Sequence, residues 1–355
     1  MKKIAVMTAG GDCPGLNAAI KSIVKTSEKL GIKVVGIKNG YIGFINGDFI
    51  EDIDVEGIEL IGGTILGSSN KDYPKRYLNP KTGKVEDITK ECVDRLLKMK
   101  IEALIMIGGD GTLTLCRDIE SYGLKVIGIP KTIDNDMVGS TPTIGYDTAV
   151  NTNVEVMSKL RTTANSHRRI MVVEIMGRTA GFLTLDSGLA GGADVILLPE
   201  QDYDLQKLAV NVKKIMENKR SCIIAISESA KEIGKEAIVS RIVESDQYES
   251  KRYGGVSFML AKKLEDLTGY EARNMTLGHM QRGGSPIPRD IIMGYCLGSY
   301  AVELLSQNET GYIVGLNKGE LTKTLIPEKV KARLLDIKTN RNYKIAKQMG
   351  VYFGD

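Results

Sequence analysis

The chain has 355 residues, of which 42% are hydrophobic and 26% are charged, and its formal net charge is +4. This is an ordinary globular composition, and the length is enough for one to three domains with large cores. The basic residues are scattered rather than gathered in a tail, so composition gives no support for nucleic-acid binding. No apolar run approaches the length of a membrane-spanning helix.

Five cysteines, none of them in a CxxC pair, are expected to be reduced thiols rather than disulfides or zinc ligands. The N-terminal residues MKKIAVMTAGG contain too short an apolar run for a secretion signal and fit a first β-strand. Both observations predict a cytoplasmic protein.

Apolar, β-branched runs alternate with segments of helical period through most of the chain. The expected strands are residues 4–7, 34–37, 103–107, 126–129, 171–175, 195–198, 222–226 and 275–277. The expected helices are residues 16–30, 93–99, 147–161, 205–216 and 255–267. Continuous apolar strands separated by helices are typical of parallel sheets covered on both faces. The predicted fold class is therefore α/β, with two parallel-sheet, Rossmann-like domains and the active site in the cleft between them.

Glycine-rich turns follow two of the expected strands. Residues 10–15 (GGDCPG) open the first helix, and residues 108–112 (GGDGT) follow the third strand. Backbone N–H groups in such a turn, together with the positive end of a helix dipole, bind anions. The first turn matches neither GxGxxG nor GxxxxGK[ST]. A purely structural tight turn explains the first about as well, and capping of a following helix by Asp110 explains the second.

Residues 132–136 (TIDND) follow the fourth expected strand. Asp134 and Asp136 are two residues apart, so in an extended segment their side chains point the same way. Two neighbouring carboxylates can divide the work of phosphoryl transfer, one as general base and one near Mg²⁺. The alternative is an Asx-rich turn without a catalytic role.

Arginines and glycines recur downstream, in SHRR at 166–169, MGR at 176–178, Arg273, and HMQRGG at 279–284. Guanidinium groups suit phosphate oxygens, although a single arginine is more often a solvated surface charge. The two histidines lack metal-ligand spacing, so zinc is not expected. The polar, turn-rich residues 70–89 read as a surface loop, with contact to a nucleotide as the alternative.

These motifs occur in the order GGDCPGLNAAI, GGTILGS, GGDGT, PKTIDND, SHRRI, MGR, ISES and LGHMQRGGSP, from Met1 to about Pro286. In this order they resemble the 6-phosphofructokinase family. The resemblance implies transfer of the γ-phosphoryl group of ATP to O1 of fructose 6-phosphate with Mg²⁺, a step of glycolysis. It also implies a homo-oligomer, a tetramer or a dimer, whose active sites are shared between subunits, with no nucleic-acid or membrane partner.

The resemblance predicts the division of the chain as well. Residues 1–138 with about 250–302 are expected to bind ATP. Residues 139–249 with about 303–320 are expected to bind the sugar phosphate, and residues 321–355 are expected to form a helical extension.

Individual roles are implied in the same way. Asp134 is the expected general base, Thr132 and Arg178 would contact the transferring group, and Asp110 and Asp136 would lie near Mg²⁺. The donor phosphates are expected at Gly11, Gly108, Gly109, Asp110, Gly111 and Thr112. The sugar phosphate is expected at Thr132, Ile133, Asp134, Arg169, Met176, Gly177, Arg178, Glu228, Arg273, His279, Met280, Gln281 and Arg282. Of these, Arg169 and Arg273 would reach the substrate of a neighbouring subunit.

Positions 111 and 131 bear on the phosphoryl donor. Pyrophosphate-using relatives typically carry Asp at 111 and Lys at 131, whereas this chain has Gly111 and Lys131, a pair that resembles the ATP-using branch of the mixed-donor subgroup. A carboxylate at 111 would crowd and repel the α-phosphate of ATP, so Gly111 predicts ATP as donor. The alternatives are a pyrophosphate-dependent phosphofructokinase, another GGDGT kinase acting on NAD or a lipid, and a non-catalytic nucleotide-binding regulator.

Overall fold

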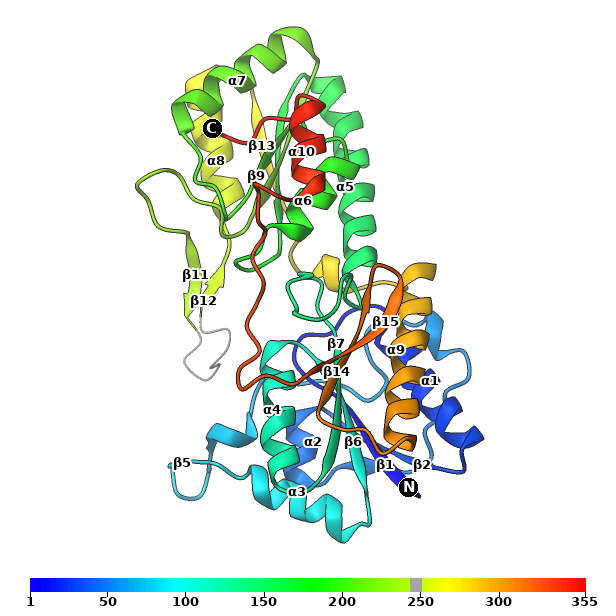
Figure 1. Ribbon diagram of the computed structural model, residues 1–355. Helices are drawn as coiled ribbons and strands as arrows, with labels where there is room; N and C mark the ends of the chain where they lie inside the picture. The colour runs from blue at the N-terminus through cyan, green and yellow to red at the C-terminus, as the bar shows by residue number, and fades with distance from the viewer. Residues whose placement is uncertain (243–250) are drawn as a thin grey trace. The chain divides into compact units, whose positions relative to one another are not determined.

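A computed structural model describes residues 1–242 and 251–355 (Figure 1). The chain divides into two compact units, here called unit 1 (Met1–Thr148 with Arg282–Ala332) and unit 2 (Ala149–Gln281 with Arg333–Asp355). Among the helices of the described ranges, none combines the length and the apolar character that crossing a bilayer requires. All five cysteines are free thiols, as expected.

The sheet of unit 1 has the strand order β15-β14-β7-β6-β1-β2-β3. Its members are β1 (Lys3–Thr8), β2 (Lys33–Ile37), β3 (Phe49–Ile50), β6 (Ala103–Gly108), β7 (Lys125–Pro130), β14 (Tyr312–Asn317) and β15 (Glu320–Leu325). Neighbouring strands from β14 to β2 pair in parallel. The edge strands β15 and β3 pair antiparallel with β14 and β2, respectively. The chain winds in opposite directions on either side of β1, so the loops after β1 and β6 adjoin a switch point, where ligands bind in open α/β sheets.

Helices cover both faces of this sheet. Figure 1 shows α1 (Leu16–Lys29) and α9 (Pro288–Ser306) on one side, and α3 (Thr89–Lys98) and α4 (Asp110–Ser121) on the other. Burial on both faces explains why every residue of β6 is buried instead of every second one. The shorter elements are α2 (Tyr41–Asn46), η1 (Ile58–Leu60), η2 (Pro74–Arg76), β4 (Tyr77–Leu78) and β5 (Val85–Glu86).

The sheet of unit 2 is entirely parallel, in the order β13-β8-β10-β9. Its strands are β8 (Ile170–Ile175), β9 (Val195–Leu197), β10 (Cys222–Ser227) and β13 (Ala272–Thr276). The helices are α5 (Tyr146–His167), which begins in unit 1, and α6 (Phe182–Ala190), α7 (Leu205–Asn218), α8 (Val256–Thr268) and α10 (Arg341–Gln348). A two-stranded hairpin, β11 (Val239–Ile242) with β12 (Lys251–Tyr253), and the helical turn η3 (Gly278–Arg282) complete the set.

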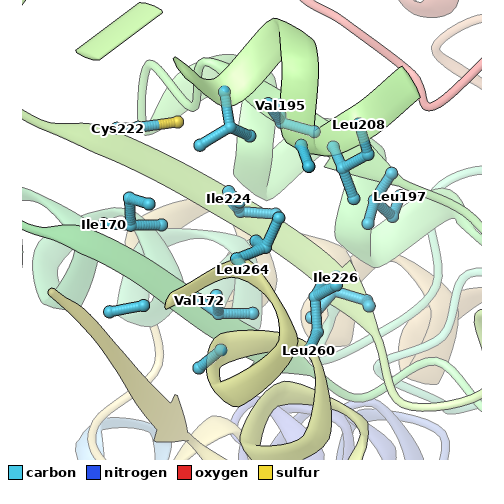
Figure 2. Packing of buried hydrophobic residues seen from close by; sticks show 14 of the residues in the cluster. Ile170, Val172, Val195, Leu197, Leu208, Cys222, Ile224, Ile226, Leu260 and Leu264 are labelled. Carbon is cyan, nitrogen blue, oxygen red and sulfur yellow. The ribbon is translucent and has the colours of Figure 1, made fainter. Parts of the chain in front are cut away.

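The core of unit 2 forms where α7 and α8 pack on one face of its sheet. Figure 2 shows Leu208 of α7 and Leu260 and Leu264 of α8 against the strand residues Ile224 and Ile226. All five side chains are at most 1% exposed. Burial of each large aliphatic side chain stabilises the fold by roughly 1.5–3 kcal/mol, so this face anchors the loops at the carboxyl ends of the strands.

The predicted α/β fold class with parallel sheets is confirmed, and each expected strand and helix is present with shifted ends. The last expected strand, residues 275–277, is instead Ala272–Thr276. Helix α9 was not among the expected helices. In the structure, an added Cβ at Gly294 would lie 2.9 Å from the carbonyl oxygen of Gly15, and one at Gly298 would lie 2.6 Å from that of Ala19. These glycines therefore permit the close contact of α9 with α1.

The unit boundaries differ from the expected domains in several places: residues 139–148 belong to unit 1, and residues 333–355 belong to unit 2. Residues 251–281 belong to unit 2, because α8 and β13 complete its sheet and core. Residues 303–332 belong to unit 1, because β14 and β15 extend its sheet. Of the expected helical extension 321–355, only α10 is helical, and residues 321–325 are strand.

Candidate active site

Three loops lie against one another at the carboxyl edge of the unit 1 sheet. After β1, the Gly10 N–H donates to the carbonyl of Ser69 at 3.1 Å, and the Ser68 hydroxyl donates to the carbonyl of Gly10 at 2.6 Å. After β7, Lys131 Nζ donates to the carbonyl of Gly11. A Cβ added at Gly10 would lie 3.6 Å from Lys131 Nζ and 3.8 Å from Thr112 Oγ1. The turns after β1 and β6 and the start of the segment after β7 therefore form one cluster.

The GGDGT turn joins β6 directly to the N-terminus of α4. Asp110 is the first helical residue, and its Oδ1 accepts a hydrogen bond from the Gly111 N–H at 2.8 Å. A Cβ added at Gly108 would lie 2.4 Å from the Thr112 side chain, so only glycine fits there. Gly109 is the N-cap of α4, and Asp110 pairs with one N–H of the first turn while remaining partly exposed. The N-termini of α1 and α4 both begin at this edge and attract anions.

Two tyrosines that the sequence analysis missed support this turn. The Tyr41 hydroxyl and Thr112 Oγ1 are 2.8 Å apart, and the Tyr73 hydroxyl lies 3.5 Å from the carbonyl oxygen of Gly111. Their rings meet edge to face with centroids 5.4 Å apart. Both tyrosines are buried. The available signal was Tyr73, one of two tyrosines in the mostly polar residues 70–89.

The TIDND segment is not extended, so the geometry on which the two carboxylates were expected to point the same way is absent, and the turn alternative describes the backbone. Asn135 has a φ of +53°, which reverses the chain between Asp134 and Asp136. The Thr132 hydroxyl accepts from the Asp134 N–H at 3.1 Å, which fixes the turn. Asp134 and Asp136 are 9% and 6% exposed. Two buried carboxylates at this edge are costly to place there, which is typical of a functional site.

A buried carboxylate from α9 holds the segment behind this turn. Asp290, fully buried, accepts hydrogen bonds from the N–H groups of Gly145 and Thr148, each at 2.8 Å, and from the Thr148 hydroxyl at 2.5 Å. The Thr143 hydroxyl in turn donates to the carbonyl of Thr132 at 2.7 Å. Burial raises the pKa of Asp290 because desolvation outweighs these hydrogen bonds. Asp290 could not be singled out from the sequence, because its partners lie about 140 positions away.

Asp290→Asn is expected to destabilise unit 1. The side chain of Asn has one accepting oxygen and one donating NH₂ group. The NH₂ group would therefore face a backbone N–H donor, and that donor would lose its hydrogen-bond partner. A buried unpaired donor costs about 1–3 kcal/mol. The thermal midpoint should fall by about 2–4 °C for each kcal/mol in a domain of this size. Thr148→Val, which removes one donor at nearly constant volume, should have the smaller effect, and an Asn variant as stable as wild type would contradict this account.

Arg282 lies against the turn after β1. Its Nη1 donates to the carbonyl of Asp12 at 3.3 Å, and a Cβ added at Gly11 would lie 2.7 Å from the same nitrogen. The structure therefore places Arg282 in unit 1 beside Gly11, whereas its η3 neighbours His279, Met280 and Gln281 belong to unit 2.

In unit 2, the loops after β8 and β10 are joined by one carboxylate. Glu228 Oε1 accepts from the N–H groups of Gly177 at 3.3 Å and Arg178 at 2.9 Å. Gly177 has a φ of +147° and Arg178 a φ of +54°. A Cβ at Gly177 would lie 2.6 Å from the carbonyl oxygen of Ala180, so glycine is required. The MGR turn and Glu228, expected together from the sequence, are thus brought together.

Gln281 ties η3 to the same loop. Fully buried, it accepts from the Met176 N–H at 3.2 Å and donates to the carbonyl of Gly278 at 3.1 Å. His279 and Met280 remain exposed beside it. Met176, Gly177, Arg178, Glu228 and Gln281 therefore form one hydrogen-bonded group at the carboxyl edge of the unit 2 sheet.

Arg169 and Arg273 meet on a shared partner, Glu271. Arg169 Nε lies 2.6 Å from Glu271 Oε2, and Arg273 Nη2 pairs with the other carboxylate oxygen. The Arg169 guanidinium is the main cause that lowers the pKa of Glu271. Both arginines keep unused donor N–H groups, since a guanidinium has five. They flank the amino end of β13, away from the MGR loop of the same unit.

The described residues contain no group of three His, Cys, Asp or Glu side chains arranged around a common metal position. Mg²⁺ in kinase sites is typically held by one or two carboxylates together with substrate phosphates. Asp110 and Asp136, on adjoining loops, are carboxylates of the kind such a site needs.

Comparison with known proteins identifies the family. The phosphofructokinase family model matches residues 3–305. The chain is 46% identical over 330 residues to a Clostridium perfringens protein named ATP-dependent 6-phosphofructokinase 2, covering 91% of this chain and 90% of the relative. It is 42% identical over 341 residues to a Dictyoglomus thermophilum protein named pyrophosphate–fructose 6-phosphate 1-phosphotransferase, covering 93% and 94%.

Similar solved structures include phosphofructokinases as well. A phosphofructokinase from Saccharomyces cerevisiae matches with a TM-score of 0.76 and 28% identity, over 92% of this chain and 45% of that one. A pyrophosphate-dependent phosphofructokinase from Marinobacter aquaeolei shares the fold, with a TM-score of 0.81 and 18% identity, over 100% of this chain and 93% of that one. The chain belongs to the phosphofructokinase family of phosphotransferases.

Proposed function

We propose that this protein is an ATP-dependent 6-phosphofructokinase, which converts fructose 6-phosphate and ATP into fructose 1,6-bisphosphate and ADP. The observation that carries the proposal is the cluster at the unit 1 edge, where glycine turns, two helix N-termini and Lys131 adjoin the buried carboxylate of Asp134. Phosphoryl transfer needs this combination, because it depends on positioning and charge neutralisation more than on covalent chemistry by the protein.

Asp134 takes the proton from the 1-hydroxyl of the sugar, and the resulting oxygen attacks the γ-phosphorus of ATP. The bond from that phosphorus to the β–γ bridging oxygen breaks, and ADP leaves. Thr132 and Arg178 contact the transferring group. The backbone at Gly11 and at Gly108, Gly109, Gly111 and Thr112 receives the donor phosphates. A general base in this role contributes ~10²–10⁴ in rate.

Mg²⁺ would neutralise the donor phosphates when bound, with Asp110 and Asp136 as its protein carboxylates. On the sugar side, Met176, Gly177 and Glu228 would hold the ring and Ile133 would pack beside it. His279, Met280, Gln281 and Arg282 would serve the 6-phosphate. Arg169 and Arg273 would act on the substrate of a neighbouring subunit in a cytoplasmic homotetramer or dimer. Their exposure and unused donors support that assignment.

Pyrophosphate is the second candidate donor, because a relative named for pyrophosphate use is 42% identical to this chain. Gly111 favours ATP, since it places no carboxylate beside the donor phosphates. A coupled assay with fructose 6-phosphate, run with ATP or pyrophosphate, tests the proposal. Turnover with ATP and little with pyrophosphate supports it. Preference for pyrophosphate supports the second candidate, and no turnover with either would overturn both.

Arg273→Ala is expected to weaken fructose 6-phosphate binding by roughly 1.5–3 kcal/mol, the contribution of a hydrogen bond to a charged group. Its side chain is 54% exposed, so folding should be little affected. KM for the sugar should rise while KM for ATP stays fixed. Lys262→Ala, on the exposed face of α8, is the matched control. A rise in the ATP KM alone would assign Arg273 to the other substrate.

A further inference from the structure

We propose that the amino edge of the unit 1 sheet, opposite the active-site loops, is a second anion-binding site that takes a small, soluble polyanion with two or more phosphate groups. A concave pocket of about 1010 Å³ lies there. Its lining, here called the lysine pocket, comprises Lys2, Lys3, Gly31, Lys33, Leu97, Met99, Lys100, Ile101, Glu102, Gly123 and Lys125. Five lysines thus face one glutamate.

Strand register gathers these lysines. Lys3 and Lys33 are directly paired residues of β1 and β2, and Lys125 is paired with Ala103, the residue after Glu102, on β6. Neighbouring strands lie about 4.8 Å apart, so Lys3 and Lys33 stand side by side, and Lys125 lies at the same edge of the sheet, two strands from Lys3. Like charges opposite each other destabilise a sheet. An anion bound among them would remove that repulsion.

Carboxylates within the protein neutralise only part of this charge. Lys3 pairs with Glu51 at 2.8 Å, and Glu102 accepts from the backbone N–H of Lys2 at 2.5 Å. In the described ranges, the side chains of Lys2, Lys33 and Lys100 form no ion pair, since no carboxylate lies within 4.0 Å of their Nζ atoms. Three ammonium groups therefore remain for a ligand.

The volume of the pocket, which is open to solvent, suits a small ligand. Pockets for small ligands and cofactors typically measure about 300–1,000 Å³, and this one is at the upper end of that range. Leu97, Met99 and Ile101 give it an apolar wall, against which the non-phosphate part of a ligand can pack. A nucleic acid or a membrane surface would require an extended basic face instead of a hollow.

The test uses a reporter inside the pocket. The full-length protein is labelled with ¹³C-methyl methionine, the Met99 signal is assigned with a Met99→Leu variant, and inorganic tripolyphosphate is added. We expect a saturable shift of the Met99 methyl signal. Lys33→Gln combined with Lys100→Gln should weaken this binding by roughly ten- to a hundredfold, given the strength of charged hydrogen bonds. Turnover should be unchanged, because neither lysine lies in the catalytic loops.

The matched control is Lys213→Gln with Lys214→Gln, two exposed lysines of α7 in unit 2, which changes the net charge equally. It should bind tripolyphosphate as wild type does. A Met99 signal that does not shift would overturn the proposal, and so would equal weakening in the control, which would indicate a general charge effect. Binding of phosphatidylserine-containing vesicles without a tripolyphosphate-induced Met99 shift would overturn it in favour of a membrane contact.

Discussion

Replacing Asp134 by Asn is expected to lower kcat by ~10²–10⁴, the usual contribution of a general base. Asn has nearly the same shape, and the turn is held by the bond from the Asp134 N–H to Thr132 Oγ1, which does not involve the replaced carboxylate. The fold and the KM for ATP should therefore be retained. Steady-state kinetics together with a circular-dichroism melt would measure both.

Asp118→Asn provides the control for this experiment. Asp118 lies on α4 in the same unit, but its carboxylate pairs with Lys75 at 2.9 Å and is not among the catalytic loops. It should retain near-normal turnover. An Asp134→Asn enzyme that keeps more than about a tenth of wild-type kcat would show that another group removes the proton, because an amide cannot act as a base.

Gly111→Asp is expected to reduce turnover with ATP sharply, by about tenfold or more, because it places a carboxylate beside a polyanion. Gly111 is buried in the first turn of α4, between Asp110 and Thr112. An acidic residue in a first turn suits the helix dipole, but burial of a carboxylate is costly, so a circular-dichroism melt must show that the variant is folded. Coupled assays with ATP and with pyrophosphate would measure the change in donor preference.

Gly111→Asn separates size from charge in this test. If repulsion dominates, Asn should retain more activity with ATP than Asp does; if crowding dominates, the two should be equally poor. Because Lys131 is already present beside Gly11, Gly111→Asp should also gain relative activity with pyrophosphate. Unchanged ATP turnover in the Asp variant would contradict the role assigned to position 111.

The sequence alone was sufficient for the fold class and the family, because both depend on local patterns. Continuous apolar strands such as β6 indicate a sheet covered on both faces, and the glycine turns that follow the strands mark its carboxyl edge. The ordered motifs indicate the family without any tertiary information. Helix α9 was not predicted from the sequence, because its glycines Gly294 and Gly298 are explained only by the close contact with α1.

Tertiary structure decided which side chains meet across long stretches of the chain. Arg282 lies against Gly11 and Asp12, some 270 residues away, and Asp290 holds Gly145 and Thr148. No periodicity encodes such contacts, because they arise when separate helices pack on one sheet.

The turn at Asn135 shows that sequence spacing can also fail to predict local geometry. Spacing suggested that Asp134 and Asp136 point the same way, but a φ of +53° between them reverses the chain. The lysine pocket likewise exists only because register aligns Lys3 with Lys33 and brings Lys125 beside Glu102. The sequence by itself determined what kind of protein this is and which residue types do its chemistry. Only folding decided their partners, because burial and hydrogen bonding are satisfied between elements that are distant in the chain.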